Sequence, residues 1–201
     1  QHVESKNKKS TSITIGINVH SNNYRFYLNL EQMTINERKT IVDDAKKLGK
    51  IIIDYSLENC KFFDSSIYLP YQVNRSEIYN LKKDLDLCFI GGRSIYRKQI
   101  INKLNKERGI NIVRGFGKKR DQYLFRHKVI INIHYKNNYN INEQLRVNRC
   151  IFNKMIVISQ KGLADDTLYL KDHMILCDYE DLVQQTINVL DNYEFYYNKL
   201  F

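Results

Sequence analysis

No apolar run in this sequence approaches the ~18 residues that a membrane-spanning helix needs, so we expect no transmembrane segment. The sequence also lacks a CxxC pair and any cluster of histidines, and its cysteines are scattered: Cys60, Cys88, Cys150 and Cys177. This spacing argues against a zinc site or a disulfide framework and predicts four reduced thiols. Reduced thiols favour a reducing compartment, so we expect a cytoplasmic protein, in the host cell's cytoplasm if the chain is viral.

Proline and tryptophan are also scarce, with one Pro and no Trp, whereas Asn, Ile, Lys and Tyr are abundant. An AT-rich genome produces this composition without any selection for function. The net charge of +10 and the pI of about 9.3 therefore have two interpretations. They reflect either that bias or an anionic partner, which would be a nucleic acid or a small phosphate-bearing ligand.

Known nucleotide-binding fingerprints are incomplete. The segment RGFGKKR, residues 114–120, contains GxG but neither the GxGxxG continuation nor an acidic residue about 20 positions later. A GxxxxGK[ST] phosphate loop is absent as well. These gaps argue against a dinucleotide-binding domain and against a P-loop ATPase or kinase.

The second half of the chain shows a regular alternation of elements. Apolar runs predict strands at 86–92, 110–117, 129–135, 155–160 and 174–178. Patterns of helical spacing between them predict helices at 94–109, 118–128, 141–154 and 179–200. This order predicts a parallel sheet covered on both faces, whose ligand binds at the carboxyl ends of the strands.

The first half predicts a smaller α/β lobe. Strands are expected at 12–20, 24–32, 50–56 and 66–70, with a helix that has a capping box at Thr34 and Glu37 and stops at Gly49. We expect a mobile tail at 1–10, a partial N-terminal lobe at 11–72, a connector at 73–84 and a Rossmann-like lobe at 85–201. No signal peptide is visible, and a first residue of Gln rather than Met fits a trimmed end.

Four turns should meet at the ligand edge of the second lobe. Glycine turns before helix N-termini favour phosphate, and arginine forks bind it. A fixed carboxylate can accept hydrogen bonds from ribose hydroxyls. Ordinary alternatives remain: such glycines are common, a strand-end histidine often only packs, and Glu143 and Arg146 can form a helix-surface ion pair. The expected site comprises Gly91, Gly92, Arg93, Arg97, Gly115, Gly117, Lys118, His134, Glu143 and Arg146.

Three segments in order, FIGGRSIYRKQIINKL, GFGKKRDQYLFRHKVIINIHY and NEQLRVNRCIFNKMIVIS, resemble the C-terminal lobe of GT-B glycosyltransferases. The likeness is to the spore-maturation-like group with bacterial and giant-virus relatives. The upstream YLNLEQMT and IIIDYSLEN resemble segments of that group's first lobe. The resemblance implies a GT-B-like fold with a short, reduced N-terminal lobe.

The resemblance also implies roles. The protein would transfer a sugar from a nucleotide-diphosphate sugar to an unknown acceptor (a glycan, a protein or a nucleic acid) without a metal or other cofactor. Glu143 would match the second glutamate of an E-x7-E pair and hold the ribose, whereas the first glutamate is replaced by Tyr135 and Gln160 stands where relatives often carry Glu. The remaining implied roles are diphosphate neutralisation by Arg97 and Lys118, pocket lining by His134, and base catalysis by His20 or its rival Glu31.

Three other functions stay open. A lobe without its first glutamate can be a catalytically degenerate module that only binds a nucleotide or a sugar. The charge and the many tyrosines fit a basic nucleic-acid-binding protein, although no known nucleic-acid motif is present. A flavodoxin-like receiver or FMN domain fits the alternation of the second lobe, but the acidic cluster of a phospho-receiver is missing.

Overall fold

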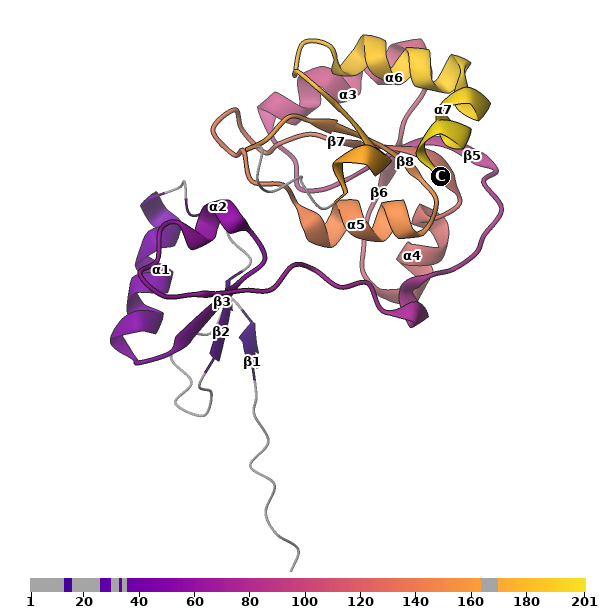
Figure 1. Ribbon diagram of the computed structural model, residues 1–201. Coiled ribbons are helices and arrows are strands. Elements are labelled where there is room, and N and C mark those ends of the chain that lie inside the picture. The colour runs from indigo at the N-terminus through magenta and orange to yellow at the C-terminus, as the bar shows by residue number, and fades with distance from the viewer. Residues whose placement is uncertain (1–12, 16–25, 30–32, 34–35, 164–169) are drawn as a thin grey trace, which may run out of the picture. The chain divides into compact units, whose positions relative to one another are not determined.

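The computed structural model describes residues 13–15, 26–29, 33, 36–163 and 170–201 of the chain. The chain divides into two compact units, with the boundary between Leu69 and Pro70. Both units are built on parallel sheets with helices, as the predicted α/β class requires (Figure 1). The predicted segment 73–84 lies within the second unit.

The first unit contains one four-stranded parallel sheet in the order β1-β2-β3-β4. Its core includes Tyr27, Met33, Val42, Ala45 and Ile52, which are nearly inaccessible to solvent. Gly49 ends the first helix in a left-handed conformation, with φ of 68°, as predicted. The elements are β1 (Ile13–Ile15), β2 (Phe26–Asn29), α1 (Asn36–Lys47), β3 (Ile51–Asp54), α2 (Leu57–Cys60) and β4 (Ile67–Tyr68).

The second unit contains a five-stranded parallel sheet in the order β6-β5-β7-β8-β9. Its elements are η1 (Arg75–Glu77), β5 (Leu85–Ile90), α3 (Ile95–Glu107), β6 (Asn111–Val113), α4 (Gly117–Leu124), β7 (His127–Asn132), α5 (Gln144–Phe152), β8 (Ile156–Gln160), η3 (Lys171–His173), β9 (Met174–Cys177), α6 (Leu182–Asp191) and α7 (Tyr193–Leu200).

Alternate residues of these strands pack into separate cores on the two faces of the sheet. Phe89 and Ile131 face α3, α6 and α7, where Ile100 and Leu182 pack against them. Cys88, Ile130 and Val157 face the opposite way, toward α4 and α5. Figure 1 shows the same division, with α3 and α6 on one side and α4 and α5 on the other. The sheet is therefore doubly wound, as the continuous apolar strands predicted.

The predicted helix 118–128 is too long, because the helix ends at Leu124 and β7 already begins at His127. The His127 ring explains this end: its Nδ1 lies 3.1 Å from the Tyr123 carbonyl oxygen and 3.0 Å from that of Leu124. An imidazole N–H in this position satisfies carbonyl groups that the helix leaves unpaired. The short basic helix is thus capped by the strand that follows it.

The predicted closing helix 179–200 is wrong as a single element, since it breaks at Asn192 into α6 and α7. The Asn192 side-chain amide donates to the Asn188 carbonyl oxygen at 2.9 Å. The Asn192 backbone leaves the helical conformation at this point, with φ of −121° and ψ of 38°. The periodicity of the apolar residues carries no trace of this change in conformation.

Within the second unit, polar contacts hold the segment before β5 to α5 and the residue after it. Arg149 Nε of α5 lies 3.0 Å from Glu77 Oε1, and the Asn153 amide donates to the Glu77 carbonyl oxygen at 2.8 Å. Glu77 also completes a capping box with Asn74 at the start of η1.

Within the described part of the chain, no helix combines the length and apolar character that crossing a membrane requires.

Candidate functional site

The centre of the second sheet contains a topological switch point. β5 and β7 are neighbours, but the connection after β5 leads outward to β6, and the connection after β7 leads to β8 on the other side. In open parallel sheets a crevice forms outside the carboxyl ends of two such strands. The residues at these ends are Gly91 and Gly92 after β5, and Ile133 and His134 after β7.

Arg97, on the first turn of α3, joins the two strand ends. Its side chain is only 4% exposed. Nε donates to the Ile133 carbonyl oxygen at 2.8 Å, and Nη1 donates to the Gly92 carbonyl oxygen at 3.0 Å. The guanidinium also lies against the aromatic rings of Phe89 and Tyr135, with centroid distances of 5.5 and 5.3 Å. Sequence reasoning gave Arg97 only a phosphate-binding role and did not foresee these structural contacts.

Glu143, at the start of α5, receives a basic group on each carboxylate oxygen. Arg97 Nη2 lies 3.1 Å from Oε1, and Arg146 Nη2 contacts Oε2. Arg146 additionally donates from Nη1 to Asn132 Oδ1, at 2.8 Å, at the end of β7. The carboxylate does not cap its own helix. The i,i+3 ion pair that the sequence offered as the ordinary interpretation is therefore confirmed. The role of Glu143 as an acceptor for ribose hydroxyls stays a prediction.

Gly91 is required where the backbone passes this cluster. A β-carbon at Gly91 would lie 3.0 Å from Phe89 Cζ, 3.1 Å from Arg97 Nη1 and 3.4 Å from Arg146 Nη2. Its φ of 154° is also one that residues with side chains rarely adopt. The glycine thus lets the chain approach both arginines closely, whereas the GG turn was predicted to let the backbone approach a ligand.

His134 lies behind this cluster and is 2% exposed. The pKa of its imidazole is lowered to about 4, chiefly by burial; Glu143 opposes this shift, and Arg97 and Arg146 add to it. The ring is therefore neutral at pH 7. The His134 backbone N–H donates to Gln160 Oε1 at 3.2 Å, and the Gln160 amide donates to the Tyr96 hydroxyl at 2.8 Å. The Gln160 side chain can make both of these hydrogen bonds, because an amide group carries a donor and an acceptor.

A cavity of about 480 Å³ adjoins the cluster, between α3 and the end of β6. Gly91 and Arg97 line the cavity and also belong to the cluster around Glu143. Arg93 of the predicted site lines the cavity as well. Arg114, directly after β6, lines the cavity too. The sequence predicted a basic turn here but not that it bounds a cavity with α3.

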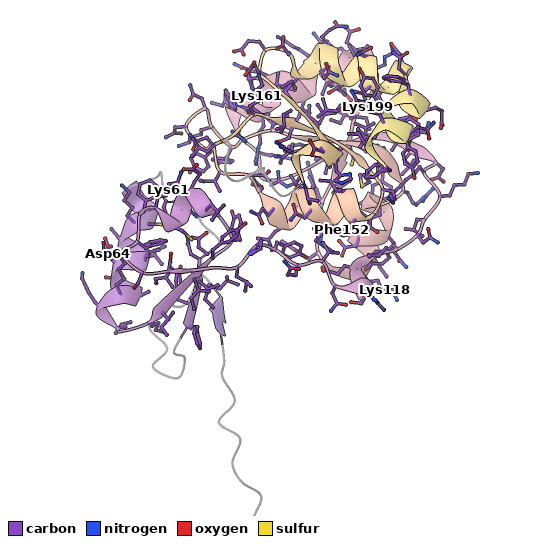
Figure 2. All side chains as sticks on the ribbon, viewed as in Figure 1. Lys61, Asp64, Lys118, Phe152, Lys161 and Lys199 are labelled. Carbon is purple, nitrogen blue, oxygen red and sulfur yellow. The ribbon has the colours of Figure 1, made fainter. Side chains whose placement is uncertain are left out.

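The other predicted residues occupy the neighbouring turn. Gly115 and Gly117 have left-handed φ values of 87° and 77°, and their side-chain positions open into empty space. Lys118 is exposed on the surface of α4 (Figure 2). Within the described ranges, no hydrogen bond or ion pair joins these three residues to Glu143. The two residues predicted to act as the base, His20 and Glu31, lie outside the described residues.

A second polar cluster lies at the strand ends of the first unit. Asn29 of β2 donates to Asp54 Oδ2 of β3 at 2.6 Å, and the Ser56 backbone N–H donates to Asp54 Oδ1 at 2.8 Å. Asn59 reaches the same Oδ1 at 3.2 Å. All four residues are fully buried. The segments YLNLEQMT and IIIDYSLEN, on which the resemblance partly rests, thus supply a buried carboxylate and its donors.

The switch-point geometry favours binding of an anion with attached hydroxyl groups. Arginines on two helices and a backbone without a side chain are suited to phosphate oxygens. Glu143 is the acceptor next to them. No group of three or more His, Cys, Asp or Glu side chains in the described segments is arranged to hold a metal ion.

No protein-family model matches this chain. Its sequence is similar to uncharacterized proteins of Acanthamoeba polyphaga mimivirus. It is 37% identical over 188 residues to L137, covering 85% of this chain and 25% of that protein. It is 32% identical over 183 residues to L140, covering 84% of this chain and 60% of that protein. The chain therefore spans a quarter of the length of one relative and about three fifths of the other.

Similar solved structures are GT-B-type glycosyltransferases at low sequence identity. An alpha1,3-fucosyltransferase matches with a TM-score of 0.47 and 13% identity, over 89% of this chain and 60% of that one. The same type of enzyme with GDP-fucose gives 0.45 and 12%, over 98% and 67%. The spinosyn rhamnosyltransferase SpnG with thymidine diphosphate gives 0.39 and 11%, over 80% and 58%.

Proposed function

We propose that this chain binds a nucleotide-diphosphate sugar at the switch point and takes part in the transfer of the sugar to an acceptor. The observation that carries the proposal is the Arg97–Glu143–Arg146 cluster between the carboxyl ends of β5 and β7. Two cations and one carboxylate, next to a glycine backbone, match a ligand with a diphosphate beside a ribose. The resemblance to GT-B glycosyltransferases names the same class of ligand.

The ligand replaces contacts that the residues now make with one another. Arg146 is 17% exposed and Arg97 4%, so Arg146 is the cation that turns toward an incoming diphosphate. When Arg146 leaves Glu143, one carboxylate oxygen becomes free to accept a ribose hydroxyl. Arg97 keeps its bonds to the Ile133 and Gly92 carbonyl oxygens and holds the two strand ends in place.

In the transfer itself, the bond between the anomeric carbon and the diphosphate oxygen breaks, and the acceptor oxygen forms a new bond to that carbon. The nucleoside diphosphate leaves with the bonding electrons, and the acceptor hydroxyl proton passes to a base. Cations beside the diphosphate stabilise the negative charge that develops on it. We keep His20 and Glu31 as candidates for the base and Lys118 as a further cation near the diphosphate.

One observation favours a different outcome, a module that binds the ligand without transferring the sugar. Tyr135 stands where the resemblance places the first glutamate, and its ring packs on the Arg97 guanidinium instead of offering a carboxylate. Incubation with UDP-, GDP- and dTDP-sugars distinguishes the two functions. Release of the free nucleoside diphosphate on addition of an acceptor supports transfer, whereas binding without release supports the module.

The test of the binding site compares Glu143→Gln with Asp191→Asn by calorimetric titration. Both changes remove a carboxylate that pairs with an arginine, but the Asp191–Arg108 pair is about half exposed and lies at the far end of α3. Glu143→Gln should weaken nucleoside-diphosphate binding by about 1.5–3 kcal/mol, the value of a hydrogen bond to a charged group. It should not weaken binding of inorganic pyrophosphate, because Arg146 is released. Equal loss for both ligands, or an equal effect of Asp191→Asn, contradicts the proposed site.

A further inference from the structure

The cavity beside the switch point has apolar walls. Phe89 and Ile101 form part of its lining, together with Ile112 at the end of β6 and Ile95 at the start of α3. Ile95 is 83% exposed. Apolar walls of this kind suit a flat ring that enters edge first, because contact with aliphatic groups stabilises the two faces of the ring.

The polar side chains of this lining are almost entirely hydrogen-bond donors. Four of them are basic, and the lining contains no Asp, Glu, Asn or Gln: the basic residues are Arg93, Arg97, Lys98 and Arg114. Arginine and lysine side chains donate and never accept. The hydroxyl of Ser94 already accepts from the Arg97 backbone N–H at 3.1 Å. A ligand in the cavity must therefore present acceptors to these side chains.

The cavity adjoins the proposed diphosphate site. Gly91 and Arg97 line the cavity, and Arg97 also binds Glu143. A ligand whose diphosphate lies at the switch point thus has its nucleoside end within reach of Arg93 and Arg114. This step rests on the proposed function.

We propose that the cavity between α3 and β6 receives the nucleobase of the donor, and that its donor-only lining selects a keto base over an amino base. Guanine, uracil and thymine present a carbonyl oxygen on the edge where adenine and cytosine present an amino group. The guanidinium of Arg114 can donate hydrogen bonds to a base that presents the oxygen. A base that presents an amino group would bind less well, because its N–H donors would face the donors of the arginine. The donor class is then a guanosine, uridine or thymidine diphosphate sugar, and an adenosine diphosphate sugar is rejected.

Inosine diphosphate and adenosine diphosphate form the matched pair for the test, because their bases differ in the oxygen or amino group on carbon 6 and the proton on the adjacent ring nitrogen. Titration calorimetry of the whole chain should show inosine diphosphate binding at least about tenfold more tightly, as one good bidentate contact would give. Arg114→Met should reduce this ratio toward one while pyrophosphate binding persists. Lys119→Met removes an exposed charge on α4 outside the cavity and should leave the ratio unchanged.

The outcomes separate this inference from the proposed function. If both nucleotides and GDP bind equally well, the site binds diphosphates but the base-selecting cavity is wrong. If adenosine diphosphate binds more tightly, the inference is also wrong. If none of these nucleotides nor pyrophosphate binds, the proposed function itself is wrong, and the inference falls with it.

Discussion

Arg97 Nη2 lies 3.1 Å from Glu143 Oε1, although the two residues are 46 positions apart in the chain. The contact spans the switch point, because Arg97 belongs to the helix after β5 and Glu143 to the helix after β7. It therefore fixes the two strand ends relative to each other before any ligand arrives. The same two residues are central to the proposed binding site, so stability and binding are coupled at this point.

We predict that Arg97→Met destabilises the second unit by about 3 kcal/mol. The change leaves the Glu143 carboxylate without one partner and the Ile133 and Gly92 carbonyl oxygens without their donor. Arg108→Met, one residue beyond the same helix, breaks an exposed ion pair with Asp191 and should cost at most about 1 kcal/mol. Urea unfolding at pH 7 measures both values, and similar losses would contradict the structural role of Arg97.

The sequence was sufficient to predict the parallel sheet of the second unit and the edge at which Gly91, Arg97, His134 and Glu143 meet. Strand ends of a parallel sheet converge by topology, so the order of elements is enough. The partners of each side chain could not be predicted, because they depend on distances that no local pattern encodes. The sequence thus left open whether Glu143 pairs with Arg146, and it gave no sign that Arg97 binds two carbonyl groups.

Boundaries were least predictable where the backbone leaves the helical conformation without a change in the apolar pattern. The sequence predicted His127 within the short basic helix, but its ring caps that helix and its backbone opens β7. Asn192 interrupts a pattern whose apolar spacing continues on both sides. In both cases the periodicity of apolar residues describes which face is buried, and it does not report where the ladder of backbone bonds stops.

We predict that the stability of the second unit falls as the pH drops from 6.5 toward 4, in part because of His134. The folded pKa is about 4 and the usual value is 6.5, so the unfolded chain takes up the proton first. A shift of this size corresponds to a loss of about 3 kcal/mol once the pH is below both values. His134→Gln should lack this component in urea unfolding at a series of pH values. Burial also lowers the pKa of His127, but it titrates in both proteins and cancels in the difference. A difference that does not change with pH would contradict the assignment.

A third prediction concerns Gly162, which the sequence did not single out. A β-carbon here would collide with the backbone carbonyl oxygen of Asn140, which accepts from the Leu163 N–H at 2.9 Å. The same β-carbon would lie 3.6 Å from His134 Cε1. Gly162→Ala should therefore cost about 2 kcal/mol and shift the His134 imidazole resonances. Gly109→Ala meets no atom within 4 Å and should cost only the roughly 1 kcal/mol of a left-handed alanine. Equal costs, with unchanged His134 resonances, would show that the loop adapts.

A fourth prediction concerns Lys83, whose Nζ donates to the carbonyl oxygens of Phe125 and Asn153. These residues cap the carboxyl ends of α4 and α5, so one ammonium group satisfies two helix ends. Lys83→Met keeps the aliphatic stem and should cost about 1–2 kcal/mol at pH 7, whereas Lys82→Met, on an exposed neighbour, should change stability by less than about 0.5 kcal/mol.

The cost of Lys83→Met should also grow with pH. Burial lowers the pKa of Lys83 to about 8, whereas the unfolded chain keeps its proton up to the usual 10.5. Between these values the unfolded state binds more protons, so the free energy of unfolding of the native protein rises with pH relative to the variant. Tyr71 and Tyr193, whose pKa values burial raises to about 12, titrate in both proteins and do not affect the difference. Urea unfolding at pH 7 and pH 10 measures it, and a gap that does not grow with pH would mean that Lys83 keeps its proton in the folded state.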